Sequence, residues 1–408
     1  MLKCNAPPYE IQRQAMLSAK GGNTQVGLCG VFKDVQSHDF DSAYVASAAS
    51  FKRMPLPEHI KRHDTREEIF KAISGVCRVI FQAPDKTYAP IFPVYGRDGR
   101  ILYVREGVSD CGYDTLRLGY RLGYKNIRIV NAFGFTDGVP DFPEYYQMCL
   151  DERNREKALH KGSALDVMWK LAGNSPIGKW FQHQHPASID LAFALGKKTG
   201  QSVELLIKHT PAEVLEVMAE QEGIPVEVMI GAYFFPFHNA ITTDRPRAAL
   251  SALISIADGW TYSHTDCVHC HGFRSDPAAI LDQYGIKMKH ERTDKAIVIR
   301  TRFGGVLPHE KLAHHTVPRG EKYKSIVKAI FDRFESGERN FKHPFNIEKP
   351  AKEVEAIRRG LNLGQYFKKK QEFNASWDNV RKLCDNGIDT LPWQSIEEIP
   401  YVNWRRAE

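Results

Sequence analysis

Alternation of apolar and polar positions divides the chain into recognisable elements. Residues 31–51 predict a strand that runs into a turn and a short helix, because an apolar stretch is followed by a run of small residues. Residues 88–134 alternate between strand and turn patterns, with Asp98-Gly99 as a hairpin turn. Asp114 is predicted to cap a short helix that ends at Gly123, and residues 127–130 predict a strand.

Helical periodicity dominates residues 143–180, with Gly162 as a break between two helices. A mixed insertion follows over 182–230. Residues 246–257 predict an apolar helix that Gly259 ends, and 260–268 predict one strand of a hairpin. An amphipathic helix is predicted over 323–334, and residues 338–408 predict a smaller C-terminal subdomain. The buried positions expected on that helix are Ile326, Ile330, Phe331 and Phe334. The mixture of elements indicates an α+β fold.

Length and composition limit the classes of protein. The 408 residues are too many for one ordinary hydrophobic core and allow two or three subdomains. The net charge of +7 is a mild basic bias, compatible with a polyanionic partner. No run of about 18 apolar residues predicts a membrane span, and residues 1–20 have no secretory-signal pattern. The eight cysteines are mostly single, which is typical of a reduced, cytoplasmic protein.

Two aspartates far apart in the sequence are candidates for phosphoryl-transfer chemistry. Such chemistry commonly uses two hard cations held roughly 3.5–4 Å apart by carboxylates. Asp39 and Asp266 each follow a predicted strand, and small or hydroxylated residues beside them leave room for a triphosphate. Taken alone, two such aspartates are ordinary surface or capping residues in most proteins, so the motifs around them decide their interpretation.

Three motifs occur in a fixed order. They are DFDSAY at 39–44, KLAGNSPIGK at 170–179 and YSHTDC at 262–267. In order and spacing they resemble the D-x-x-S-L-Y-P, K-x-x-x-N-S-x-Y-G-K and Y-x-D-T-D-S motifs of family B DNA polymerases. Shorter similarities at 90–103, 239–247 and 378–392 favour the protein-primed subgroup of phages and linear plasmids. The resemblance covers most of the chain.

The resemblance implies the right-hand architecture of polymerases, with an antiparallel-sheet palm, a helical fingers hairpin and a small thumb. The expected boundaries are 1–142 for the first part of the palm, 143–181 for the fingers, 182–235 for an insertion, 236–320 for the second part of the palm and 321–408 for the thumb. It also implies DNA-directed DNA synthesis on primer-template DNA with deoxynucleoside triphosphates and two Mg²⁺ ions.

Residue roles follow position by position from the resemblance. Asp39, Asp266 and the main-chain carbonyl of Phe40 are the expected metal ligands. The positions expected to bind the nucleotide are Ser42, Ala43, Tyr44, Lys157, Lys170 and Asn174, with Lys161 as an alternative to Lys157. In the family the tyrosine at the place of Tyr44 packs under the sugar and excludes a 2′ hydroxyl group. The lysines neutralise triphosphate charge.

A second set of positions is expected to contact template and primer. It comprises Ser175, Gly178, Thr265, Arg302 and Lys311. The glycine lets its helix approach the nascent base pair, and the segment 300–303 (RTRF) occupies the place of the family's K-x-Y element. Phosphate contacts of this kind supply position rather than sequence recognition.

Two positions depart from the family pattern. Ile177 replaces a tyrosine and removes a stacking surface near the templating base. His264 stands where the family has the first aspartate of D-T-D, and neutral imidazole is a poor ligand for Mg²⁺. Activity is expected with Asp266 as the retained ligand, with Mn²⁺ as a further cofactor. The alternative is a catalytically weak or inactive relative that binds DNA or scaffolds a replication complex.

Histidines and cysteines are concentrated between His264 and His271, where Cys267 and Cys270 have the spacing of a zinc knuckle. No second C-x-x-C occurs, so a hairpin with incidental cysteines is preferred over a zinc-containing nucleic-acid module. Only 38 residues precede Asp39, too few for the 3′–5′ exonuclease domain of the family. The expectation is synthesis without proofreading, with a separate exonuclease or a terminal or replisome protein as partner.

Overall fold

The computed structural model describes residues 8–96, 100–180, 183–184, 188–210, 212–224, 229–230, 235–301, 303–306, 323–351 and 353–400. The chain divides into two compact units. The first comprises residues 1–181, 235–341 and 375–408, and the second comprises 182–234 and 342–374. The expected thumb, 321–408, is therefore divided between the two units. The predicted hairpin turn at Asp98-Gly99 lies outside the described residues, although the two short strands on either side of it do pair.

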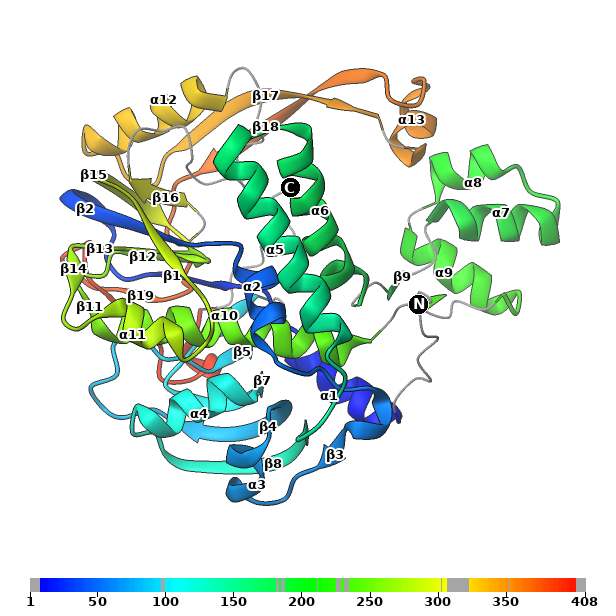
Figure 1. The fold of residues 1–408 in the computed structure, drawn as a ribbon. Helices are drawn as coiled ribbons and strands as arrows, with labels where there is room; N and C mark the ends of the chain where they lie inside the picture. The colour runs from blue at the N-terminus through cyan, green and yellow to red at the C-terminus, as the bar shows by residue number, and fades with distance from the viewer. Residues whose placement is uncertain are drawn as a thin grey trace. The chain divides into compact units, whose positions relative to one another are not determined.

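An antiparallel sheet of six strands forms one layer of the first unit (Figure 1). Its order is β1-β12-β13-β2-β15-β16, so the long strand β2 lies between β13 and β15. Phe40 and Val268, on neighbouring strands, are buried in the same apolar core and fix one face of this sheet. The strands span Asn23–Val26 (β1), Gly30–Phe40 (β2), Tyr262–Thr265 (β12), Cys267–Cys270 (β13), Met288–Arg300 (β15) and Phe303–Val306 (β16).

The segment predicted as one strand over 260–268 is in fact a hairpin of two short strands. β12 pairs with β13, and the chain reverses at Thr265 and Asp266. Thr265 has φ 58°, a left-handed conformation rare for a β-branched residue, and Asp266 N–H donates to the His264 carbonyl at 2.7 Å. The alternating pattern of residues does not distinguish one strand from two when the turn contains no glycine or proline.

A second antiparallel sheet has the order β3-β8-β4-β7, with strands at Lys61–Arg62, Lys125–Phe135, Ser74–Gln82 and Glu106–Gly112. Helices α1 (Tyr9–Ser18) and α4 (Tyr113–Arg121) pack on it, and α3 (Arg66–Lys71) precedes β4. A two-stranded ribbon, β5 (Pro93–Tyr95) with β6 (Ile101–Tyr103), contacts β7. The predicted cap at Asp114 is wrong. Gly112 is the residue that precedes the helix, and Asp114 lies in its first turn. The carboxylate of Asp114 accepts a bond from Arg245 Nε instead of capping the helix.

Helix α10 (Pro236–Ile256) runs between the two sheets, contacting β4 and β7 on one side and β1 and β13 on the other (Figure 1). The helix begins ten residues before the predicted start at 246, and Pro246 is buried inside it. A helix that started at 246 would have this proline in its first turn, where the missing N–H has no partner in the helix. Burial on both sides stabilises the continuous helix despite the hydrogen bond that proline removes.

A layer of three helices covers the end of β2. α2 (Ala43–Ser50) follows the strand after two residues, and it packs against α5 (Asp141–His160) and α6 (Ala164–Lys179). The predicted break at Gly162 is present between α5 and α6, where φ is +85°. Gly173 allows α6 to approach α2, since a Cβ atom at that position would lie 2.9 Å from Val45 Cγ2.

The remaining elements of the first unit are small, apart from helix α12 (Tyr323–Glu335). Its predicted buried face is largely present, with Ile330, Phe331 and Phe334 buried, but Val327 takes the place expected for Ile326. Phe331 packs against Phe303 of β16, with 5.4 Å between ring centroids and the ring planes tilted by 50°. The others are α11 (Pro277–Asp282), β11 (Ala257–Asp258), β14 (Gly272–Phe273), β19 (Lys382–Leu383), β20 (Thr390–Leu391), η1 (Pro57–His59) and η3 (Ile396–Glu398).

The second unit combines three helices from the insertion with a long ribbon. Leu191, Leu195 and Leu206 are buried in its apolar core. Arg358 Nε of α13 donates to the Ile207 carbonyl of α8 at 3.2 Å, which joins its two chain segments. The elements are β9 (His183–Gln184), α7 (Ser188–Thr199), α8 (Val203–His209), α9 (Ala212–Gln221), β10 (Met229–Ile230), β17 (Lys342–Pro350), α13 (Glu353–Arg359) and β18 (Tyr366–Asn374).

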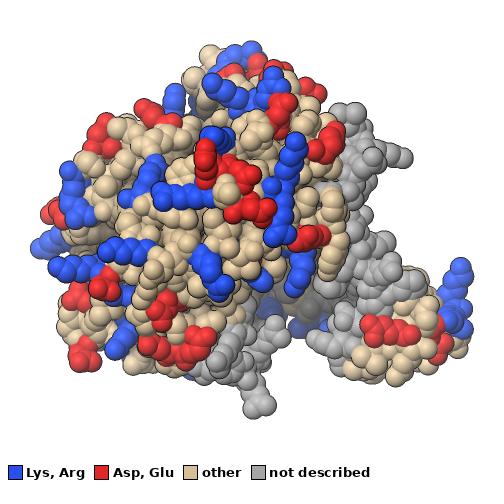
Figure 2. Space-filling view, turned by 90° about the horizontal axis from the view of Figure 1, so that it is seen from below, with Lys and Arg blue, Asp and Glu red and all other residues tan. Residues whose placement is uncertain are grey.

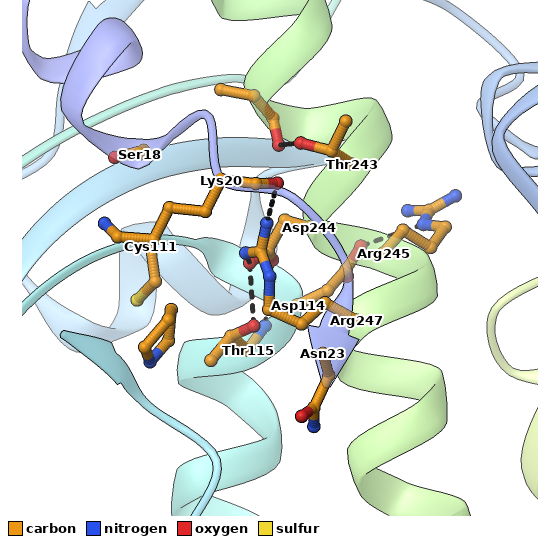
Figure 3. A network of polar contacts seen from close by, with 12 residues as sticks. Ser18, Lys20, Asn23, Cys111, Asp114, Thr115, Thr243, Asp244, Arg245 and Arg247 are labelled. Carbon is orange, nitrogen blue, oxygen red and sulfur yellow. Dashed lines mark hydrogen bonds and ion pairs between the residues drawn. The ribbon is translucent and has the colours of Figure 1, made fainter. Parts of the chain in front are cut away.

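A buried polar network joins α10 to the segment before β1 and to α4 (Figure 3). Arg247 is fully buried; its Nη1 donates to Asp244 at 3.1 Å and its Nε to the Gly21 carbonyl at 3.2 Å. Asp244 in turn accepts two bonds from Thr115, at 2.7 and 3.0 Å.

Among the described ranges, no helix is both long and apolar enough for a membrane crossing.

Candidate active site

Asp39 and Asp266 come together in the six-stranded sheet although they are far apart in sequence. Asp39 is the penultimate residue of β2 and pairs in register with Cys267, which follows Asp266. Phe40 N–H donates to the main-chain oxygen of Asp266 at 2.8 Å, and this bond fixes the turn beside the end of β2. Both aspartates line one pocket of about 370 Å³.

The two carboxylates have different surroundings. Burial and, to a smaller extent, the nearby charge of Asp39 raise the pKa of Asp266 to about 7. Asp39 instead accepts a bond from Lys289 Nζ at 2.9 Å, and the same ammonium group lies 3.7 Å from Glu291 Oε1. The ammonium group of Lys289 therefore offsets part of the negative charge at Asp39.

The turn between β2 and α2 forms one wall of the pocket. Ser42 precedes α2 with φ 55°, and its hydroxyl oxygen accepts a bond from Arg153 Nη1 at 2.6 Å. Arg153 also pairs with Asp166 at 3.2 Å, and Lys157 pairs with Asp41 at 3.2 Å. Helix α5 thus presents two cations to the loop that follows Asp39, each with a carboxylate partner.

Helix α6 forms the opposite wall with Lys170 and Asn174, one turn apart. Asn174 Nδ2 donates to the Lys170 carbonyl at 2.8 Å, which holds the amide against its own helix. Around the pocket the charges balance. Five acidic and five basic side chains line it, namely Asp39, Asp41, Asp166, Asp266 and Glu291 with Arg153, Lys157, Lys161, Lys170 and Lys289.

Tyr44 lies at the boundary between this pocket and a second one of about 480 Å³. Burial raises the pKa of its phenol to about 12, so the hydroxyl stays protonated. The second pocket is lined by Thr265 and His264, and by Arg100 and Arg300. A Cβ atom on Gly22 would lie 2.4 Å from Thr265 Cα, so this glycine permits the close approach of the segment before β1.

The structure brings together the predicted metal and nucleotide positions. The pocket lining includes Asp39, Phe40, Ser42, Ala43, Tyr44, Lys157, Lys161, Lys170, Asn174 and Asp266. His264 lines the second pocket and is not among the residues that line the first.

The predicted template and primer positions are more dispersed. Thr265 lines the second pocket, whereas Ser175 and Gly178 are exposed on α6 and line neither of the two pockets. Arg302 and Lys311 lie outside the described residues. Ile177 is buried in an apolar cluster with Trp180, so this isoleucine serves the core rather than the pocket.

Five pocket residues were absent from the sequence-based set: Arg153, Asp166, Lys289, Glu291 and Asp41. The first two lie on the predicted helices, and helical spacing could have indicated which way their side chains point. Lys289 and Glu291 lie on β15, whose register against β2 contains two irregularities. The sequence holds no signal for that register.

The histidines and cysteines near the hairpin do not converge. Cys270 and His269 are buried, and Cys267 is half-buried beside Asp39 in the sheet. Within the described ranges, no three His, Cys, Asp or Glu side chains form a group that could hold a metal ion.

On the face seen in Figure 2, basic and acidic side chains are interspersed.

No family model and no curated protein matches this sequence. Among solved structures, Phi29 DNA polymerase in complex with primer-template DNA and incoming nucleotides matches 90% of this chain at 14% identity, with a TM-score of 0.55. That match covers 64% of the Phi29 chain. The same enzyme in an orthorhombic crystal form matches 91% of this chain and 64% of its own length, at 14% identity and TM-score 0.54.

The Phi29 enzyme with primer-template DNA in a post-translocation binary complex gives the same TM-score of 0.54, at 14% identity, over 91% of this chain and 63% of its own. At such identity the similarity is one of fold. The chain spans less than two thirds of the length of this relative. The chain therefore has an α+β fold with antiparallel sheets similar to that of Phi29 DNA polymerase.

Proposed function

We propose that this chain is a template-directed DNA polymerase that adds a deoxynucleoside monophosphate to a primer 3′ hydroxyl group and releases pyrophosphate. The observation that carries the proposal is the shared pocket of Asp39 and Asp266, faced by Lys157 and Lys170 from two helices. The fold similarity to a polymerase solved with primer-template DNA and incoming nucleotides supports the same activity.

In this proposal the six-stranded sheet with α10 is the palm, and the hairpin of α5 and α6 is the fingers. Helix α12 begins the thumb. The position of Tyr44, at the boundary of two pockets, fits a side chain that contacts the sugar of the incoming nucleotide. A phenol there leaves no room for a 2′ hydroxyl group, which makes deoxynucleotides the substrates.

The donor set fits two Mg²⁺ ions. Asp39, Asp266 and the carbonyl oxygen of Phe40 are hard oxygen ligands, and Mg²⁺ uses few protein carboxylates together with substrate phosphates. The raised pKa of Asp266, caused by burial and by Asp39, marks negative charge that a divalent ion would neutralise. When bound, such ions activate the primer hydroxyl group and stabilise charge on the transferred phosphate.

The protein's own contribution is position and charge. Lys157 is held by Asp41 at 3.2 Å and Arg153 by Asp166, so both cations are placed before a nucleotide arrives. Lys170 approaches from α6, and Asp41, Ser42 and Ala43, which follow β2, line the same pocket. These groups bind and orient a triphosphate and neutralise the charge that grows on it during transfer.

Primer extension tests the proposal. The purified chain should extend a primed template with the four deoxynucleoside triphosphates in Mg²⁺ or Mn²⁺, and Asp39→Asn or Asp266→Asn should slow extension by at least about a thousandfold. Asp332→Asn, an exposed carboxylate on α12, is the matched control and should keep wild-type activity. Full extension by folded Asp39→Asn protein would refute the proposal.

His264 favours a second candidate, a polymerase-like protein that binds DNA without catalysis. The family pattern has a carboxylate at this position, and here the side chain lines the neighbouring pocket instead. This candidate predicts binding of primer-template DNA with no incorporation in either metal. Under the first candidate, a separate exonuclease and a terminal or replisome protein are the proposed partners.

A further inference from the structure

Lys289 lies within the candidate metal site itself. It pairs in register with Asp39 across β2 and β15, and its Nζ atom lies 2.9 Å from Asp39 Oδ2. The same Nζ atom is 3.7 Å from Oε1 of Glu291, two residues further along β15. Both carboxylates and the lysine line the pocket that contains Asp266.

The ammonium group stands at an oxygen that the proposed function assigns to a divalent ion. A monovalent and a divalent cation at one carboxylate oxygen repel each other strongly at such short range. Burial without compensation is costly for paired carboxylates, so an ammonium group beside Asp39 stabilises the ion-free site. The same contact has to be given up when a metal ion takes the oxygen.

We propose that Lys289 is a built-in competing cation, which occupies the metal position at Asp39 in the ion-free protein and lowers the affinity of the site for divalent ions. This inference rests on the proposed function, because it takes Asp39 as a metal ligand.

The strand provides a second position for the ammonium group. Glu291 lies at an irregularity of β15, and its Oε1 atom is already 3.7 Å from Nζ in the same pocket, so it can accept Lys289 after it leaves Asp39. The lysine side chain is 44% exposed and has a flexible stem, so this movement requires no rearrangement of the core. Glu291 is 17% exposed and remains inside the pocket.

Direct binding of Mn²⁺ to the full chain, without DNA or nucleotide, tests the inference. The free ion is measured by electron paramagnetic resonance during titration. Lys289→Met should bind Mn²⁺ about tenfold more tightly than the wild type, because an ammonium group near the ion is removed. Lys289→Arg keeps the charge and should remain within about twofold of the wild type.

Lys295→Met is the matched control. Lys295 lies on the same strand and pairs with Glu335, and neither residue lines this pocket. It should not change Mn²⁺ binding. Unfolding temperatures of all variants without metal establish that each is folded. Mn²⁺ binding by folded Lys289→Met that equals or falls below the wild-type affinity would overturn the inference.

Asp39→Asn separates this inference from the proposed function. If Asp39→Asn weakens Mn²⁺ binding while Lys289→Met leaves it unchanged, the metal site stands and the competing cation does not. If Asp39→Asn leaves Mn²⁺ binding unchanged, Asp39 is not a ligand, and both the inference and the metal site of the proposed function are overturned.

Discussion

At the scale of single residues, the pocket places two chemically identical side chains, Asp39 and Asp266, in different environments. Asp266 is half-buried beside Asp39 and has a raised pKa, whereas Asp39 is paired with an ammonium group. Two separate motifs, at 39–44 and 262–267, pointed to these residues from the sequence, since local spacing is enough to recognise each motif. Their environments depend on strands that meet only in the folded chain, and the sequence contains no equivalent signal for them.

Lys170 supports a prediction at this scale. Lys170→Ala should raise the KM for deoxynucleoside triphosphates roughly tenfold to a hundredfold, because a charge-assisted hydrogen bond to phosphate contributes about 1.5–3 kcal/mol. Steady-state primer extension measures the change. Lys179→Ala, on the same helix but outside the pocket lining, should leave KM near wild type. An equal KM for the two variants would remove Lys170 from the nucleotide site.

At the scale of elements, the errors of sequence-based prediction lie where packing overrides local preference. Local preference favours a helix that starts at Pro246, but burial between two sheets keeps α10 continuous through it. Thr265 adopts a left-handed conformation that its β-branched side chain disfavours. The sequence therefore does not indicate a turn at this position. Strained residues of this kind cluster at functional sites, and Thr265 precedes Asp266.

The network of Figure 3 gives a prediction for how α10 is held. Arg247→Met should lower the free energy of unfolding by about 3–5 kcal/mol, because it leaves the buried Asp244 carboxylate without its cation. Thermal unfolding reports the loss. Burial already raises the pKa of Asp244, so the double variant Arg247→Met with Asp244→Asn should recover part of the stability.

Lys328→Met is the matched control for this variant. It breaks an exposed pair with Asp332 on α12 and should change stability by less than about 1 kcal/mol. If Arg247→Met is no more destabilising than Lys328→Met, the network does not tie α10 to α4 and to the segment before β1.

At the scale of the whole molecule, the site exists because separate segments of the first unit converge. β2 supplies Asp39, the hairpin of β12 and β13 supplies Asp266, the α5–α6 hairpin supplies most of the cations, and β15 supplies Lys289. Ordered motifs predicted this convergence, since each marks one segment. They did not predict that residues 342–374 group with the insertion, because such grouping depends on contacts between distant segments that leave no local pattern.

Anomalous diffraction from crystals grown with Mn²⁺, primer-template DNA and a non-hydrolysable deoxynucleotide tests the central claim most directly. The account predicts two manganese peaks between the carboxylates of Asp39 and Asp266, roughly 3.5–4 Å apart, with the triphosphate extending toward Lys157 and Lys170. Manganese bound elsewhere, with neither carboxylate as a ligand, would contradict it.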